Sequence, residues 1–390
     1  MSMKKKPLAL LFPAGLALAS CSVEANVDSS ADRSADGADV DNYTIEEVAS
    51  FDEPWAAAFL PGTQMLVITE KAGAIKAIDT ATGETLPVSG APEVDYGGQG
   101  GLGDVAFLTS EAGDASQERS IYLSWAEAGN GDTRGAVVGK GTFACSETAC
   151  AISDLEIVWQ QAPKVTGRGH YSHRIRFSPD EAHMFVASGD RQKLDPAQDN
   201  SNTIGTIVRL NLDGSAAAGN PMADQPSPTN EIWSYGHRNI LGMDWDAQGR
   251  LWDMEHGPAG GDELNLVAAG ANYGWPTRSN GNHYSGDPID DHSEDDGFTK
   301  PAIHWTPVIA PGDMIFYSGD MFAAWQGDAL IASLAEPGLI RIEIDGDSAT
   351  EAQRYPFENR IRSVDQGPDG ALWLLEDGEG GRLMKLSSEE

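Results

Sequence analysis

A short unit recurs along most of this chain: a turn rich in Gly, Asp or Pro, a short apolar strand, a second turn and a second strand. Turns of this type begin at residues 59, 177, 245, 326 and 366, and a sixth pair of short apolar strands lies at 103–107 and 121–125. Several of the strands alternate apolar and polar residues, with the period of a half-buried β-strand. Six such units at roughly 50-residue spacing predict an all-β fold, namely a six-bladed β-propeller of four-stranded antiparallel blades. A sandwich of two sheets with long loops is the alternative.

Composition agrees with many short strands and excludes some classes of partner. The chain has 390 residues with 44 Gly and 10 Trp, and helical periodicity is scarce. The formal net charge of −34 argues against nucleic acid and anionic membrane surfaces as partners. This charge favours solubility and leaves the substrate open.

The first residues predict export. Three lysines at positions 4–6 precede an apolar stretch at 8–19, as in a secretory signal. The stretch ends in Leu-Ala-Ser-Cys and resembles a bacterial lipobox, which implies a signal peptide at 1–20 and a lipid anchor on Cys21. Residues 21–42 are small and acidic and suggest a flexible tether, so the folded domain is expected at 43–390. We therefore expect a periplasm-facing lipoprotein of the bacterial envelope; Ser22 favours the outer membrane, and plain secretion is the alternative.

Two cysteines remain after Cys21. In an oxidising compartment, the C-x4-C spacing of Cys145 and Cys150 predicts a local disulfide. Two free thiols are the alternative.

Polar groups, glycines and prolines are concentrated at 235–276. The chain must turn at Gly257 and Pro258, and a turn exposes backbone carbonyls. Together with the Glu263 carboxylate, such carbonyls suit Ca²⁺. Arg238 and Asn239 suit a planar, anionic, oxygen-rich ligand if they face the same pocket. A solvated turn at Asp262 and Glu263 is the alternative.

Three other segments contain groups able to perform chemistry. His170 precedes a strand and could serve as a general base, although a surface histidine is the commoner case. The glycines around Gln99 allow close approach of a ligand, but no Lys-Ser/Thr or helix follows as in a phosphate loop. Arg360 and Arg362 occupy alternate positions of a strand, so their side chains should point the same way.

These segments together resemble the soluble PQQ-dependent sugar dehydrogenases, in particular the aldose branch. The specific match is RN at 238–239, EHGPxGGDELN at 255–265 and GxNYGWP at 270–276, and a weaker likeness extends over residues 53–386. The resemblance implies that His170 is the catalytic base and that Arg238 stabilises charge on the quinone. It implies contacts with PQQ from the following residues: Gln99, Arg238, Asn239, Tyr284, Ala335, Arg360 and Arg362.

The resemblance also implies two calcium sites. One ion would bridge the cofactor and the carbonyls of Gly257 and Pro258. A structural ion would use Glu263 and Tyr273. The acidic run at 287–296 is more typical of a solvated loop than of a metal site.

The implied reaction is oxidation of the C1 hydroxyl of an aldose to a lactone. Electrons would pass to an external acceptor, because the chain has no C-x-x-C-H haem motif. The sequence departs from the family pattern at His173, where a small residue is usual, and at Gly169, where some members have an Asp that orients the base. Ala335 replaces a Lys of the glucose-oxidising branch. A calcium-dependent propeller lactonase and a non-catalytic envelope binding propeller are the alternatives.

Overall fold

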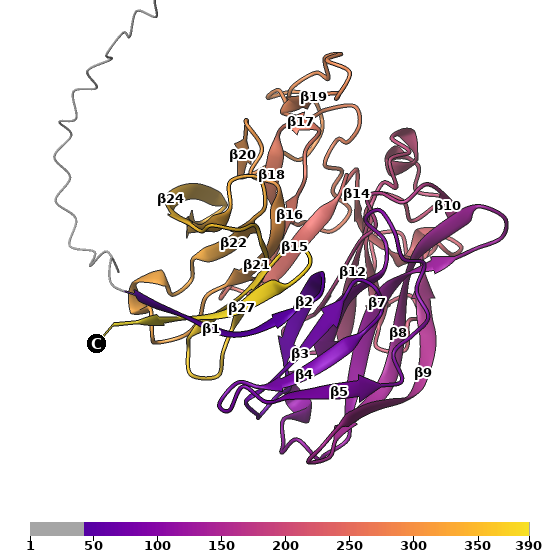
Figure 1. Ribbon diagram of the computed structural model, residues 1–390. Coiled ribbons are helices and arrows are strands. Elements are labelled where there is room, and N and C mark those ends of the chain that lie inside the picture. The colour runs from indigo at the N-terminus through magenta and orange to yellow at the C-terminus, as the bar shows by residue number, and fades with distance from the viewer. Residues whose placement is uncertain (1–42, 390) are drawn as a thin grey trace, which may run out of the picture. The chain divides into compact units, whose positions relative to one another are not determined.

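The computed structural model describes residues 43–389, and within them strands dominate (Figure 1). Four short 3-10 helices interrupt the strands at Thr109–Glu111, Asp195–Gln198, Thr229–Glu231 and Ala323–Trp325. The all-β prediction is confirmed. The predicted signal peptide, lipid anchor at Cys21 and tether all fall outside the described residues. Among residues 43–389, no helix has the length and apolar character needed to cross a membrane.

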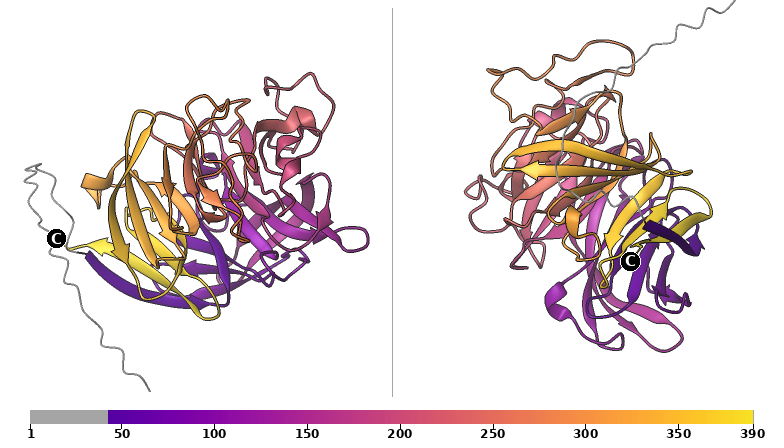
Figure 2. Two further views of the ribbon diagram at one scale, coloured as in Figure 1. Left: turned by 90° about the horizontal axis from the view of Figure 1, so that it is seen from above. Right: turned by 90° about the vertical axis from the view of Figure 1, so that its left-hand side faces the viewer.

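Four sheets contain four antiparallel strands each. The first joins the two ends of the described chain, since β1 (Tyr43–Phe51) pairs with β27 (Gly381–Ser388), followed by β26 (Leu372–Glu376) and β25 (Ile361–Gln366). In Figure 2 these indigo and yellow strands lie side by side. The other three sheets follow chain order: β11 (Ser172–Phe177), β12 (His183–Ser188), β13 (Thr206–Asn211) and β14 (Ile232–Tyr235); β15 (Ile240–Trp245), β16 (Leu251–Glu255), β18 (Asp262–Leu266) and β20 (Ile303–Trp305); β21 (Pro311–Phe316), β22 (Ala329–Ser333), β23 (Gly338–Asp345) and β24 (Ser348–Pro356).

A larger sheet of nine strands contains two antiparallel runs. Its path is β2 (Pro54–Phe59), β3 (Met65–Glu70), β4 (Ile75–Asp79), β5 (Thr85–Ser89), β9 (Cys150–Gln160), β8 (Thr133–Cys145), β7 (Arg119–Ala128) and β6 (Leu102–Phe107), with β10 (Val165–Thr166) against β8. A short parallel pairing of β5 with β9 joins the two runs, through Val88 to Cys150 and Ser89 to Ala151. A further two-stranded ribbon pairs β17 (Ala259–Gly260) with β19 (Gly281–Asn282).

Cys145 and Cys150 face each other where β8 and β9 meet, and their sulfurs are bonded. The predicted local disulfide is therefore confirmed.

The innermost strands contact one another in a closed cycle. Strand β2 contacts β6, which contacts β11, and the contacts continue through β15, β21 and β25 back to β2. The middle strands β3, β16, β22 and β26 are buried along their whole length, whereas the outer strand β24 alternates between exposed and less exposed residues. This difference is the burial expected when sheets pack face to face with their outer edges in solvent.

Arg174 of β11 ties most of the inner strands together. Its guanidinium lies 4.2 Å from the Trp55 ring centre on β2 and 3.2 Å from the Asp104 carboxylate on β6. It donates hydrogen bonds to the carbonyls of Leu241 on β15 and Gly312 on β21, at 2.6 and 2.7 Å. The Arg174 side chain is 1% exposed, so every donor must be satisfied inside the protein.

We expect Arg174→Met to destabilise the protein by about 3–5 kcal/mol, because the methionine would leave the Asp104 carboxylate buried without this partner. The free energy of unfolding in urea measures the effect. Arg354→Met is the matched control, since Arg354 is 37% exposed in its pairs with Glu351 and Glu336 and should cost at most about 1 kcal/mol. Equal losses in the two variants would contradict the role given to Arg174.

Candidate active site

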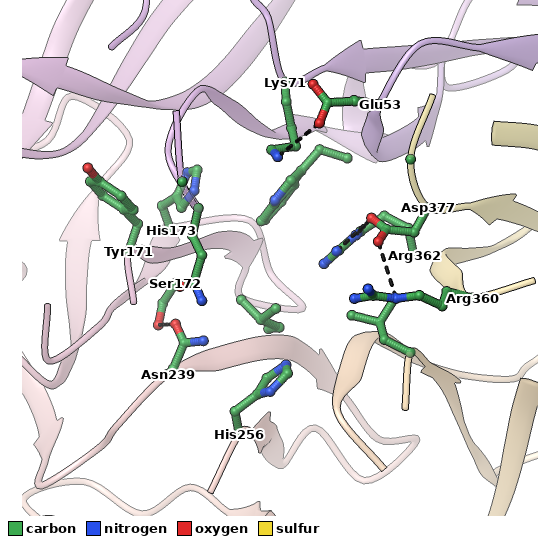
Figure 3. Close-up of a pocket in the computed structure, with 16 residues that line it drawn as sticks. Glu53, Lys71, Tyr171, Ser172, His173, Asn239, His256, Arg360, Arg362 and Asp377 are labelled. Carbon is green, nitrogen blue, oxygen red and sulfur yellow. Dashed lines mark hydrogen bonds and ion pairs between the residues drawn. The ribbon is translucent and has the colours of Figure 1, made fainter. Parts of the chain in front are cut away.

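A cavity of about 280 Å³ lies where the inner strands begin. Its wall includes Trp55 from β2, Ser172 and His173 from β11, and Arg362 from β25 (Figure 3). Loop residues complete it: Gln99 and Asn239 precede the inner strands β6 and β15, and Leu334 follows the middle strand β22. Residues far apart in the sequence therefore meet at one place.

The cavity wall is richer in cations than the chain as a whole. It contains Lys71, Arg360 and Arg362, against the carboxylates of Glu53 and Asp377. Asp377 accepts two hydrogen bonds from Arg362 at 2.7 and 2.8 Å, and Arg360 lies 3.4 Å away (Figure 3). The two arginines thus line the same cavity, as their alternate positions predicted. In a protein with a net charge of −34, this concentration of positive charge favours an anionic ligand.

Gln99 joins the cavity wall to His170. The Gln99 side-chain oxygen accepts a hydrogen bond from the His170 backbone N–H at 2.6 Å. The Gln99 N–H in turn donates to the Arg168 carbonyl at 2.8 Å. His170 itself is 6% exposed and has a positive φ of 46°, a conformation that non-glycine residues adopt where surrounding contacts impose it.

Asp190 orients the His170 ring. The imidazole Nδ1–H donates to Asp190 Oδ1 at 2.6 Å, and the Trp275 indole N–H donates to Asp190 Oδ2 at 2.8 Å. Since a carboxylate can only accept, the bond fixes the proton on Nδ1 and leaves Nε2 as the basic atom. Sequence analysis did not find this partner, because Asp190 follows β12 in a loop and no local motif links it to His170.

His170 is held in its neutral form. Burial lowers its pKa below the usual value, and the Arg238 charge lowers it further, while Asp190 partly offsets both effects. A neutral imidazole with Nε2 free can accept a proton at neutral pH.

Arg238 presents a fixed cation beside His170. One terminal nitrogen donates to the His256 carbonyl at 2.9 Å and the other to the Tyr284 hydroxyl at 3.3 Å. Its Nε is buried and has no hydrogen-bond partner within the described residues. Tyr284 is 75% exposed, so it covers the guanidinium from the solvent side.

A buried carboxylate fixes the backbone of the Arg-Asn pair. Glu255 Oε2 accepts the N–H of Arg238 at 2.6 Å and of Asn239 at 3.3 Å. Glu255 Oε1 accepts from His237 Nδ1 at 3.2 Å. Burial pulls the pKa of His237 down, but Asp253 and Glu255 more than offset it and the pKa is raised. His237 thus helps to hold Glu255, and through Glu255 it positions Arg238.

A second, much smaller cavity brings the predicted calcium groups together. It has about 10 Å³, room for one small atom, and its wall includes Arg238, Gly257, Glu263 and Tyr273. Pro258 follows Gly257 but does not line this cavity. The Tyr273 hydroxyl is occupied by Leu266 and Ala268, so only its carbonyl remains as a possible metal ligand.

Two carboxylates, Glu255 and Glu263, line the small cavity together with two arginines, Arg238 and Arg278. Glu263 lies directly opposite Glu255 in the pairing of β18 with β16. Burial raises the pKa of Glu263 well above its usual range, and Glu255 and Asp253 raise it further. Burial also raises the pKa of Asp262 to about 6. A solvated turn at Asp262 and Glu263 is therefore wrong: both residues are buried on a strand, where a bound cation would compensate their charge.

Comparison with known proteins agrees with this geometry. The family model for glucose/sorbosone dehydrogenases matches residues 51–385. The chain belongs to the glucose/sorbosone dehydrogenase family. It is 37% identical over 341 residues to the aldose sugar dehydrogenase YliI of Escherichia coli, covering 86% of this chain and 90% of that protein.

Solved structures of glucose/sorbosone dehydrogenases resemble this one along its length. The soluble aldose sugar dehydrogenase of Escherichia coli, in its apo-form, has a TM-score of 0.82 at 35% identity, covering 89% of this chain and all of that one. The PQQ-bound aldose sugar dehydrogenase of Streptomyces coelicolor has a TM-score of 0.71 at 26% identity, covering 89% and 98% of the two chains.

The position of Ala335 limits the contacts that it can make with a ligand. Its N–H donates to the Ile309 carbonyl at 2.9 Å, so only the Ala335 carbonyl could serve a ligand. The neighbouring Leu334 lines the cavity instead.

We expect the pKa of His170 to lie below 6.5 and to fall further in Asp190→Asn, because that change removes the negative charge that favours the imidazolium. Titration of the imidazole signals by NMR, assigned with His170→Gln, measures both values. Asp195→Asn, an exposed acid of the same loop, should leave the pKa unchanged. A His170 pKa that rises in Asp190→Asn would contradict the assigned contact.

Proposed function

We propose that this protein is a PQQ- and calcium-dependent dehydrogenase that oxidises the C1 hydroxyl of aldose sugars to lactones and passes the electrons to an external acceptor. One observation carries the proposal: a neutral, Asp190-oriented His170 lies beside a cation-lined cavity through its bond to Gln99. The proposal agrees with membership in the glucose/sorbosone dehydrogenase family and with PQQ bound to a relative.

The donors of the large cavity fit a planar tricarboxylate. Arg360, Arg362 and Lys71 supply the positive charge that carboxylates require. Asn239 and Gln99 add amide groups for quinone and ring atoms. Arg238 lines the small cavity beside this one, and its Nε is a buried donor without a partner among the described residues.

The oxygen atoms around the small cavity are suitable ligands for Ca²⁺. Glu263 offers a carboxylate, and the carbonyls of Gly257 and Tyr273 are neutral oxygen ligands of the kind that hard cations prefer. The family resemblance adds the Pro258 carbonyl as a further oxygen ligand. The raised pKa of Glu263 supports a cation there, because an unpaired buried carboxylate is costly.

Each of these groups then has a distinct role in the reaction. When bound, PQQ supplies the two-electron acceptor and Ca²⁺ supplies Lewis-acid polarisation. His170 accepts the hydroxyl proton at Nε2, while Asp190 holds Nδ1–H and stabilises the imidazolium that forms. Arg238, whose backbone is fixed by Glu255, provides a positive charge where negative charge develops.

We also infer that the sheets are the six four-stranded blades of a β-propeller. The closed cycle of contacts among β2, β6, β11, β15, β21 and β25 supports this. On this interpretation the nine-stranded sheet contains two blades, β2–β5 and β6–β9, joined by the short β5–β9 pairing.

We further propose that the protein is an envelope lipoprotein that faces the periplasm and is held at the membrane by lipid on Cys21. The apolar stretch at 8–19 and the Leu-Ala-Ser-Cys sequence before Ser22 support this. The Cys145–Cys150 disulfide agrees with an oxidising compartment.

The deciding experiment measures reduction of an artificial dye by the purified protein with glucose, galactose or xylose. We expect reduction only when PQQ, Ca²⁺ and an aldose are all present, and loss of reduction on chelation of Ca²⁺. Bound PQQ without dye reduction by any aldose would indicate another alcohol substrate. Failure to bind PQQ would contradict the proposal and favour a calcium-dependent lactonase, tested by lactone hydrolysis, or a binding propeller.

A further inference from the structure

His173, in the wall of the large cavity, has an energetically unfavourable backbone conformation. It has a positive φ of 52°, in the left-handed region that glycine adopts readily and other residues rarely. It lies where the pairing of β11 with β12 shifts register, between Ser172 and Ile175. A bulky residue in such a conformation indicates that its side chain is used.

The chain makes room for this ring at Gly103. A Cβ added to Gly103 would lie 1.9 Å from His173 Cε1 and 2.2 Å from Nδ1. The ring also packs against Trp55, with 4.9 Å between the ring centres. Glycine at position 103 therefore leaves the space that the His173 imidazole occupies, and Trp55 packs against the ring.

The contacts of Ser124 fix the tautomer of His173. Ser124 is fully buried, and its Oγ accepts the Asp104 N–H at 2.8 Å. Its hydroxyl hydrogen needs an acceptor, and His173 Nδ1 lies 2.9 Å away. Burial lowers the pKa of His173 to about 3, so the ring is neutral, Nδ1 accepts and Nε2 carries the hydrogen.

Nε2 is left facing the cavity. The Nδ1 and Cε1 edge of the ring is turned to Ser124 and Gly103, and His173 lines the large cavity (Figure 3). No group among residues 43–389 forms a hydrogen bond with Nε2. A side chain that is 2% exposed thus presents one unpartnered donor to whatever fills the cavity.

We propose that His173 is a further binding residue of the large cavity, donating a hydrogen bond from Nε2–H to an acceptor oxygen of the anionic ligand. This rests on the proposed function, in which that ligand is PQQ. Because the ring is neutral, it adds a directional donor without adding to the charge of Lys71, Arg360 and Arg362.

Two variants of His173 test the two nitrogen atoms of the imidazole ring separately. Gln places an amide N–H near the position of imidazole Nε2, whereas Asn places its polar atoms near Nδ1, where they can keep the bond to Ser124. Titration of PQQ into the purified protein, followed by calorimetry and tryptophan fluorescence, gives the Kd. We expect His173→Gln to bind within about threefold of wild type, and His173→Asn to raise the Kd by about 10- to 100-fold, the range for a hydrogen bond to a charged group.

The contact with Gly103 provides an independent test. Gly103→Ala should raise the Kd for PQQ, because its methyl displaces the His173 ring. In a His173→Gly background, the same change should leave the Kd unaltered. Thermal unfolding of each variant checks that it is folded.

The possible failures can be told apart. If wild type binds PQQ and His173→Asn binds it equally tightly, the inference about His173 is wrong and the proposed function stands. If folded wild-type protein does not bind PQQ, the proposed function is wrong, and the inference fails with it.

Discussion

The rest of the structure depends on the contacts of one buried group, the Arg174 guanidinium. It touches Trp55 on β2 and Asp104 on β6, and it binds carbonyls of β15 and β21. Asp313 continues the network to β25, where it accepts a hydrogen bond from Ser363. One residue of β11 therefore links the inner strands from which the large cavity is built. Its two immediate predecessors, Ser172 and His173, line that cavity, so the packing that closes the fold also positions binding groups.

The site separates charge within a strongly acidic chain. Positive charge gathers in the large cavity through Lys71, Arg360 and Arg362, whereas carboxylates gather behind Arg238 around Glu255 and Glu263. Each cluster is unfavourable by itself, and each becomes favourable with a ligand of opposite charge. The proposed binding of a polycarboxylate next to a divalent cation would neutralise both clusters. Arg238 lies between them and lines the small cavity while remaining close to His170.

The sequence predicts the strands far better than it predicts contacts between them. The turns predicted at residues 59 and 245 precede β3 and β16, because apolar–polar alternation and flanking turns are local signals. The pairing of β1 with β27, and the joining of two runs into a nine-stranded sheet, depend on distant segments and have no local pattern. The same holds in the site. Arg362 lies on β25 and Arg360 directly precedes that strand, so the two could be placed together. The partner of His170, Asp190, lies 20 residues away on another loop.

The most direct test of the central claim is a single turnover without an external acceptor. Protein loaded with PQQ and Ca²⁺ is mixed anaerobically with an aldose, and the absorbance of the bound quinone is followed. We expect a rapid change in wild type that reaches one equivalent of sugar per site. In His170→Ala the rate should fall by about 10²- to 10⁴-fold while PQQ remains bound. An unchanged spectrum with every aldose, or equal rates in wild type and His170→Ala, would contradict the account.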